Sequence, residues 1–166
     1  YAAAKVAATH YLQMLYRSKG FPAVILRPFF IYGLGQDKEK FIPWAIEKAT
    51  LGHDINMTKG EQTRDPISVN DVAEAFVRAC VEKRAIGEVV NVASGFPITI
   101  TEIADIIFTT INRGSLKRGA QPYRPGEIMR SEADMTKSVE ILGSLSTTSV
   151  SDVYAGIKKL AEGDAI

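Results

Sequence analysis

Apolar and polar positions follow helical spacing in some stretches of the chain and strand-like spacing in others. Apolar residues that recur every three or four positions predict helices, and short β-branched runs bounded by glycine or proline predict strands. The expected helices cover residues 1–19, 39–51, 70–84, 102–112, 134–142 and 149–162, and the expected strands cover residues 22–27, 54–58, 64–69 and 88–94. Helices and strands that alternate in this way favour an α/β fold.

Sequence signals also predict where several helices begin and end. Gly20 is the expected C-cap of the first helix, and Asn70 is the expected N-cap of the third. Thr99 and Glu102 have the spacing of a capping box. Cys80 falls on the apolar stripe of helix 70–84, so we expect its side chain to be buried in the core.

The first helix is apolar on most of its faces. Ala4, Ala8, Tyr11 and Leu15 lie on one side, and further apolar residues lie on the others. Such a helix is expected to be buried on more than one side, which requires a thick domain or a partner chain. The chain begins with Tyr1 rather than methionine, inside this helical pattern, so we interpret it as a piece of a longer protein.

Composition and charge narrow the class of protein. The 166 residues are 46% hydrophobic, which suits one globular unit. Lys and Arg total 20 against 19 Asp and Glu, and the net charge of +1 argues against a nucleic-acid partner. A single cysteine excludes an intrachain disulfide, and the isolated His10 and His53 offer no metal spacing. Without an apolar run of bilayer length or a secretory leader, we expect a cytoplasmic protein with no membrane partner.

The first helix carries the pair of residues that most clearly indicates acid–base chemistry. Tyr1 and Lys5 are four positions apart, so their side chains lie one above the other on one helix face. An ammonium close to a phenol favours its ionised form, and the pair can therefore donate and accept a proton. The alternative is a surface tyrosine beside a solvated lysine, because such spacing also arises by chance.

Further motifs follow this pair in a particular order. After the Tyr-x-x-x-Lys pair and a strand come the segments Arg-Pro-Phe-Phe-Ile-Tyr-Gly (27–33), Thr-Arg-Asp (63–65), Val-Asn-Asp-Val-Ala-Glu-Ala (69–75), Gly-Glu-Val-Val-Asn-Val-Ala-Ser-Gly (87–95) and Arg-Pro-Gly-Glu (124–127). The ordered set resembles the carboxyl-terminal half of extended short-chain dehydrogenases/reductases, in the NAD-dependent epimerase/dehydratase family of nucleotide-sugar enzymes. The resemblance covers nearly the whole chain, from residue 1 to about residue 143.

The resemblance implies a fold and a function. The expected architecture is the last part of a Rossmann-type parallel sheet plus a small mixed α/β substrate-binding domain. Residues 1–36 would end the dinucleotide-binding domain, and residues 37–166 would be mainly substrate-binding, with 64–95 partly returning to the Rossmann sheet. The implied activity is epimerase or dehydratase chemistry on a nucleoside-diphosphate sugar with NAD or NADP. Implied partners are the missing amino-terminal half of the protein and, through the first helix, a second copy in a homodimer.

The same resemblance assigns roles to individual residues. Tyr1 would be the catalytic acid/base, and Lys5 would assist it and bind the nicotinamide ribose. Pro28 and Ile31 would line the nicotinamide by backbone and apolar contact. The remaining assignments concern the substrate: Arg64, Arg124 and Glu127 for the diphosphate and the ribose, and Phe41, Ile55 and Met57 for the walls of the nucleobase pocket.

Several of these assignments have alternatives that the residues leave open. Arg64 can form a surface pair with Asp65, and the three apolar wall residues can be ordinary core. Residues 113–130 hold five basic residues and one acidic residue, a net charge of +4 that would favour an anionic ligand. Within that segment we interpret Arg113, Lys117 and Arg118 as solvated.

The family pattern is incomplete in this chain. No glycine-rich phosphate loop is present, and Phe30 stands where related enzymes often have asparagine. Two hypotheses therefore remain: the chain is half of an enzyme and inactive alone, or it is a non-catalytic binding or scaffold module that kept the fold.

Overall fold

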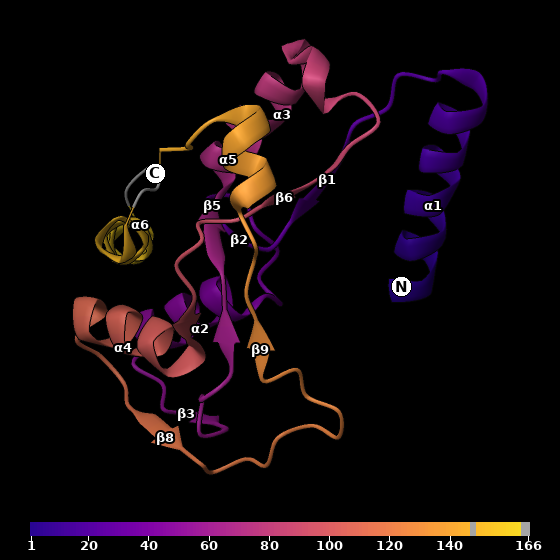
Figure 1. Ribbon diagram of the computed structural model, residues 1–166. Helices are drawn as coiled ribbons and strands as arrows, with labels where there is room; N and C mark the ends of the chain where they lie inside the picture. The colour runs from indigo at the N-terminus through magenta and orange to yellow at the C-terminus, as the bar shows by residue number, and fades with distance from the viewer. Residues whose placement is uncertain (147–148, 164–166) are drawn as a thin grey trace.

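The computed structural model describes residues 1–146 and 149–163, so residues 147–148 and 164–166 of the expected substrate-binding region lie outside the described residues. Helices and strands alternate, as the sequence predicts (Figure 1). The helices are α1 (Ala2–Lys19), α2 (Phe41–Thr50), α3 (Val69–Val81), α4 (Ile100–Ile111), α5 (Thr136–Leu142) and α6 (Val150–Glu162), with a short 3-10 helix at Lys83–Ala85. The strands are β1 (Ile25–Pro28), β2 (Phe30–Tyr32), β3 (Ile55–Met57), β4 (Thr63–Arg64), β5 (Pro66–Ser68), β6 (Val89–Val92), β7 (Ile98–Thr99), β8 (Leu116–Arg118) and β9 (Arg130–Ser131).

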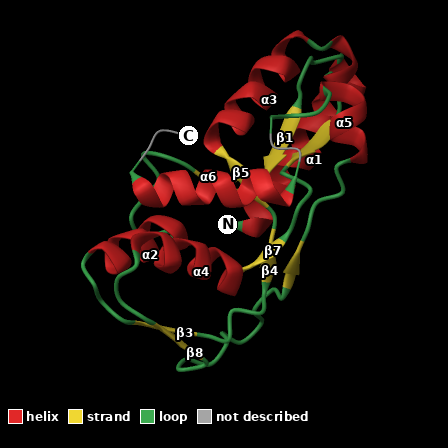
Figure 2. Cartoon of the chain, turned by 90° about the vertical axis from the view of Figure 1, so that its left-hand side faces the viewer, coloured by secondary structure: helices red, strands yellow, loops and turns green. Residues whose placement is uncertain are grey.

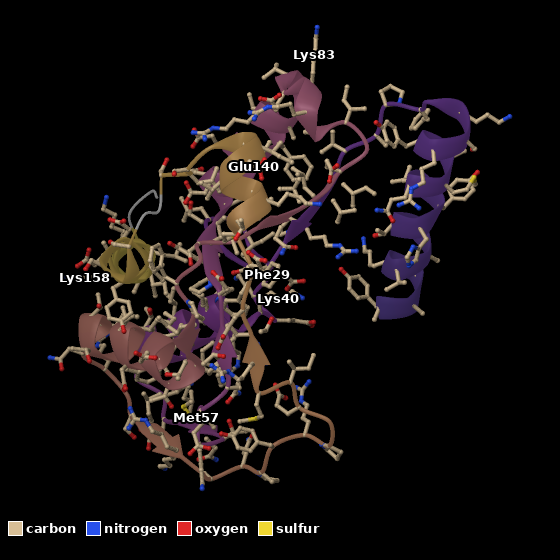
Figure 3. The ribbon with its side chains drawn as sticks, in the orientation of Figure 1. Phe29, Lys40, Met57, Lys83, Glu140 and Lys158 are labelled. Atoms are coloured by element: carbon tan, nitrogen blue, oxygen red, sulfur yellow. The ribbon has the colours of Figure 1, made fainter. Side chains whose placement is uncertain are left out.

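Parallel strand pairs form the centre of the molecule. β1 pairs with β6, and β2 pairs with β5, both in parallel register. The two pairs join at Phe29, whose N–H donates to Val92, while the N–H of Phe30 donates to Asp65. Figure 3 shows Phe29 in the middle of the molecule, between the upper and lower parts. The expected α/β fold with parallel strands is confirmed.

Two hydrophobic cores lie on either side of this junction. One packs α3 and α5 against β1 and β6, and its fully buried residues include Ile67, Val90 and Val92. The other packs α2, α4 and α6 together over β3, around Ile103 and Ile107. Figure 2 shows α3 and α5 in the upper part of the view, and α2, α4 and α6 below them. Between the two cores lies β4, which pairs with β7 in antiparallel register and with β9 in parallel register.

Helix α1 stands beside the rest of the chain and runs antiparallel to β1 (Figure 1). It ends at Gly20 in the left-handed conformation, as predicted. Within this chain α1 is not buried on several sides, since Thr9 is its one buried residue, and its burial against the rest of a thicker domain or a partner chain stays a prediction. The tertiary contact sits at the end of the helix, where the Tyr16 ring packs so closely on Gly87 that a Cβ there would collide with it.

Two sequence predictions for α3 are also wrong. Ser68, rather than Asn70, is the N-cap, because its hydroxyl accepts a hydrogen bond from the N–H of Asp71. Cys80 is exposed, because α3 turns Val72, Ala75 and Ala79 toward the sheet instead. The exposed face that includes Cys80 and Phe76 borders an apolar groove of about 350 Å³ beside β1, lined also by Val24 and Leu26.

Other local predictions differ less from the structure. The capping box of Thr99 and Glu102 at the start of α4 is confirmed. The expected strand 64–69 is divided at Asp65 into β4 and β5, and β8 forms within the basic segment 113–130, for which no strand was predicted. In the described part of the chain, none of the helices combines the length and apolar character needed to cross a membrane.

Candidate functional site

Tyr1 and Lys5 share one face at the start of α1. The Lys5 Nζ lies 5.4 Å from the centre of the Tyr1 ring, over its face. Tyr1 is 96% exposed, so the pair stands in solvent rather than in a cleft of this chain. The helical backbone sets their separation, since the N–H of Lys5 donates to the carbonyl of Tyr1. Four-residue spacing alone is sufficient to bring the phenol and the ammonium together.

Pro28 and Ile31 lie on either side of the junction at Phe29, where the two parallel strand pairs meet. Pro28 ends β1 opposite Val92, and Ile31 lies in β2 opposite Ile67. Both side chains are half-buried. The loop that follows is fastened to the strand, because the Gln36 amide donates to the carbonyl of Ile31 at 2.8 Å. These residues thus lie near the carboxyl ends of parallel strands, the edge at which open α/β sheets bind ligands.

The structure brings Arg64 and Glu127 together although 63 residues separate them in sequence. The Nη2 atom of Arg64 lies 2.7 Å from a carboxylate oxygen of Glu127, and both side chains are about four-fifths buried, with exposures of 20% and 22%. Arg64 Nη1 also donates to the carbonyls of Thr63 and Ile128. Glu127 is therefore the carboxylate partner of Arg64, and the alternative of an Arg64–Asp65 surface pair is wrong.

Asp65 points into the protein instead and is fully buried. One of its carboxylate oxygens accepts hydrogen bonds from the N–H and hydroxyl of Ser94 and from the N–H of Gly95, at 2.9, 2.7 and 3.0 Å. The other accepts from the N–H of Ala133 at 3.2 Å. One side chain thereby joins three distant segments directly beside Arg64. Sequence reasoning missed this role because an Arg-Asp dipeptide on its own indicates an exposed pair.

Arg124 lies in the exposed loop between β8 and β9, three residues before Glu127. The N–H of Glu127 donates to the carbonyl of Arg124, which makes a tight turn of this segment. A second link fixes the same loop, because the Tyr123 hydroxyl interacts with both the backbone N–H and the carboxylate of Glu61 at 3.1 Å. Arg64, Arg124 and Glu127 therefore occupy one neighbourhood, which Tyr123 and Glu61 also stabilise.

The three expected wall residues are placed differently from one another. Ile55 and Met57 are 3% and 6% exposed, and both belong to the core under α4. Figure 3 shows Met57 at the lower end of the molecule, far from α1. Phe41 is half-buried at the start of α2, with its ring centre 6.2 Å from that of Trp44. The core interpretation therefore describes Ile55 and Met57 in this structure.

Three other basic residues of segment 113–130 have partners at the surface. Lys117 pairs with Asp54 at 3.0 Å, Arg118 pairs with Asp105, and Arg113 donates to the carbonyl of Thr50. Arg124, in contrast, takes part in none of the ion pairs formed within residues 1–146 and 149–163. The described residues also contain no group of three or more His, Cys, Asp or Glu side chains suited to a metal ion.

These features can be compared with known proteins. A model of the NAD dependent epimerase/dehydratase family matches residues 1–93, more than half of the chain. The chain belongs to this family. The match begins at the Tyr1–Lys5 pair and includes Arg64 and the parallel strand pairs β1–β6 and β2–β5.

Individual members of the NAD-dependent epimerase/dehydratase family support the same conclusion. A CDP-abequose synthase from Salmonella muenchen is 31% identical over 81% of this chain and 45% of its own length. A human dTDP-D-glucose 4,6-dehydratase is 34% identical over 63% of this chain and 30% of its own length. The chain thus spans less than half the length of these curated relatives.

A solved structure of the family has the same fold over nearly all of the chain. It is a UDP-N-acetylglucosamine 4-epimerase from Methanobrevibacter ruminantium M1 in complex with UDP-N-acetylmuramic acid, with 27% identity and a TM-score of 0.85. The similarity covers 98% of this chain and 52% of that one. The expected Rossmann-type architecture is therefore confirmed, and the description of the matching family model confirms the NAD dependence of the family.

In the present chain, the two groups of predicted site residues, Tyr1–Lys5 and Arg64–Glu127, lie apart. Tyr1 and Lys5 begin α1, whereas Arg64 lies on β4, and Figure 1 shows α1 separated from the body that carries β9. In the part of the chain that the structure describes, no hydrogen bond or ion pair connects the Tyr1–Lys5 pair to the Arg64–Glu127 pair. The structure assembles each group separately.

Proposed function

We propose that the chain is the carboxyl-terminal half of an NAD-dependent enzyme that epimerises or dehydrates the sugar of a nucleoside-diphosphate sugar. The observation that carries the proposal is the Tyr1–Lys5 pair, stacked at 5.4 Å in a member of the epimerase/dehydratase family. Names of relatives support the substrate class, since they act on CDP-, dTDP- and UDP-linked sugars.

Tyr1 and Lys5 would handle the proton. The Tyr1 phenolate, stabilised by the Lys5 ammonium, would take the proton from a sugar hydroxyl and become the neutral phenol, which would return the proton later. Bound NAD would supply the group that accepts and returns a hydride. Lys5 would also donate to its ribose, and Pro28 and Ile31 fit a flat ring, because both present half-buried apolar surface near the carboxyl ends of the strands.

Arg64 and Arg124 would hold the diphosphate, and Glu127 would accept hydrogen bonds from the ribose. Guanidinium groups suit this task because their planar N–H groups match phosphate oxygens. The backbone of the loop carrying Arg124 and Glu127 is anchored beside Arg64, which supports the proposal that the three side chains contact one ligand. Phe41 is half-buried and would contact a nucleobase. Ile55 and Met57 would support that pocket indirectly, as part of the core packed beside it.

The complete site would require more protein than this chain. The two relatives are more than twice as long as the segment they share with it. The exposed faces of α1 and the apolar groove beside β1 would be covered by an amino-terminal half of the same protein, and α1 would contribute to a homodimer. Residues 1–36 would belong to the dinucleotide-binding domain and residues 37–166 mainly to the substrate-binding domain, in a cytoplasmic enzyme.

Replacing the phenol in the complete protein tests this proposal. Tyr1→Phe removes the hydroxyl and keeps the ring, so turnover of a nucleoside-diphosphate sugar should fall by about 100-fold or more, the usual contribution of a general acid or base. Nucleotide-sugar affinity should change by less than about threefold, since binding rests on other residues. Turnover is followed by product analysis under saturating NAD, and affinity by calorimetry.

Tyr11→Phe is the matched control, because Tyr11 is an exposed tyrosine on the same helix. It should leave turnover unchanged. Turnover retained in Tyr1→Phe would overturn the proposed role of Tyr1. A complete wild-type protein that binds nucleotide sugars without converting any of them would favour the binding module over the enzyme.

A further inference from the structure

The Arg64–Glu127 pair presents a conflict for ligand binding. Both hydrogens of Arg64 Nη1 are directed to backbone carbonyls, those of Thr63 at 2.7 Å and Ile128 at 2.8 Å. Arg64 Nη2 donates to Glu127 at 2.7 Å. Most of this guanidinium is therefore engaged by the protein before any ligand arrives, and its charge is balanced by a carboxylate.

The neighbouring structure holds Glu127 in this position. The N–H of Glu127 donates to the carbonyl of Arg124. The loop that carries Glu127 is held before it by the contacts of Tyr123 with Glu61. It is held after it by the hydrogen bond from Arg64 to the carbonyl of Ile128. Both members of the ion pair are about four-fifths buried, so water screens their attraction only partly. The pair is thus part of the folded structure rather than a transient surface contact.

This arrangement treats different anions differently. A bare polyphosphate that approaches Arg64 meets the Glu127 carboxylate and is repelled by it, because like charges in a partly buried site are unfavourable. A nucleoside diphosphate brings the same phosphates together with ribose hydroxyls, which are hydrogen-bond donors. Those hydroxyls can donate hydrogen bonds to the Glu127 carboxylate and so replace the one that it loses from the Arg64 guanidinium.

We propose that Glu127 is a specificity-determining residue: it withholds Arg64 from phosphate anions that lack a ribose and releases it to a nucleoside diphosphate. This inference rests on the proposed function, because it requires that a nucleoside diphosphate bind at Arg64 and Arg124. It adds that the ion pair itself sets discrimination, and that ligand binding exchanges the Arg64–Glu127 contact for two contacts with the ligand.

The ratio of two dissociation constants measures this discrimination. Inorganic pyrophosphate and the tightest-binding of UDP, dTDP and CDP are titrated by calorimetry into the complete wild-type protein and its Glu127→Gln variant. Glu127→Gln removes the negative charge and keeps nearly the same shape, so pyrophosphate should bind more tightly. The nucleoside diphosphate gains less, since it loses a charged acceptor for its ribose. The dissociation constant of pyrophosphate divided by that of the nucleoside diphosphate should therefore fall by about tenfold.

Two further variants keep the test specific. Glu132→Gln is the matched control, because Glu132 lies nearby and pairs with the exposed Arg130 at 3.2 Å instead of with Arg64. It should change the ratio by less than about twofold. Glu127→Asp retains the charge and should keep most of the discrimination, which separates the effect of charge from any loss of packing if Glu127→Gln is poorly folded.

Each outcome decides the inference. A ratio that falls in Glu127→Gln but is kept in Glu132→Gln and Glu127→Asp supports it. An unchanged ratio in Glu127→Gln overturns it and leaves the proposed function intact. A wild-type protein that binds none of the three nucleoside diphosphates contradicts the proposed function, and this inference falls with it.

Discussion

The two groups of candidate site residues are built in contrasting ways. Tyr1 and Lys5 meet through the spacing of a single helix and stand exposed, on an element that has one buried residue. Arg64 and Glu127 meet across 63 residues of sequence, in a partly buried pair anchored by backbone and side-chain contacts. The first group requires only local structure, whereas the second requires that a large part of the chain is folded.

This difference has an energetic consequence. A change at an exposed helical pair alters few contacts, so it should leave the stability of the chain almost unchanged. A change beside the anchored pair removes hydrogen bonds that join distant segments, so it should lower stability and disturb the geometry of Arg64 as well. Stability measurements on this chain can therefore separate the two regions independently of activity.

The largest expected effect comes from Asp65, which joins three segments beside Arg64. Asp65→Asn places an NH2 group where a carboxylate oxygen now accepts hydrogen bonds, so at least one buried N–H loses its acceptor. The free energy of unfolding, measured with urea, should fall by about 3 kcal/mol. Asp54→Asn, at an exposed ion pair, and Tyr1→Phe, on α1, should each leave the free energy of unfolding almost unchanged. Equal losses in all three variants would contradict the contrast.

A smaller effect is expected from Gly156→Ala in α6. Alanine normally stabilises a helix relative to glycine by about 1 kcal/mol, but a Cβ here would collide with the hydroxyl of Tyr32. Tyr32 is fully buried, and its burial, together with the charges of Asp71 and Asp152, raises its pKa to about 12, so the hydroxyl stays protonated. Thermal unfolding should show a net loss of about 1–2 kcal/mol. Tyr32→Phe in the same chain should recover part of it; no recovery would mean that the collision is not the cause.

The smallest of these effects concerns the capping box of α4, and it depends on pH. Hydrogen bonds from the Thr99 hydroxyl and N–H, and one from Tyr154, hold the pKa of Glu102 below its ordinary value. Because the folded-state pKa is the lower one, this stabilisation is present above the unfolded pKa and is lost as pH falls through the folded pKa. Glu102→Gln should therefore lose about 1 kcal/mol near pH 7 and little near pH 2 in urea titrations. A loss of the same size at both pH values would disprove this assignment.

Local signals in the sequence were sufficient for some features and misleading for others. The capping box and the Gly20 helix end depend on neighbouring residues alone, so both are found as predicted. Cys80 was expected to be buried because the apolar stripe of its helix is wide, and the sequence does not indicate which edge of that stripe meets the sheet. Asp65 is adjacent to Arg64, yet its side chain is fully buried while that of Arg64 pairs with the distant Glu127.

Helices α1 to α6, the juxtaposition of Tyr1 with Lys5, and the family could be predicted from the sequence alone, because each depends on residue types and on spacing along the chain. Only the tertiary structure decided that Glu127 is the partner of Arg64, that Asp65 is a buried junction, and that α1 lies exposed. These features depend on which distant segments come into contact, and the free energy of such contacts comes from burial and hydrogen bonding between residues that no local pattern relates.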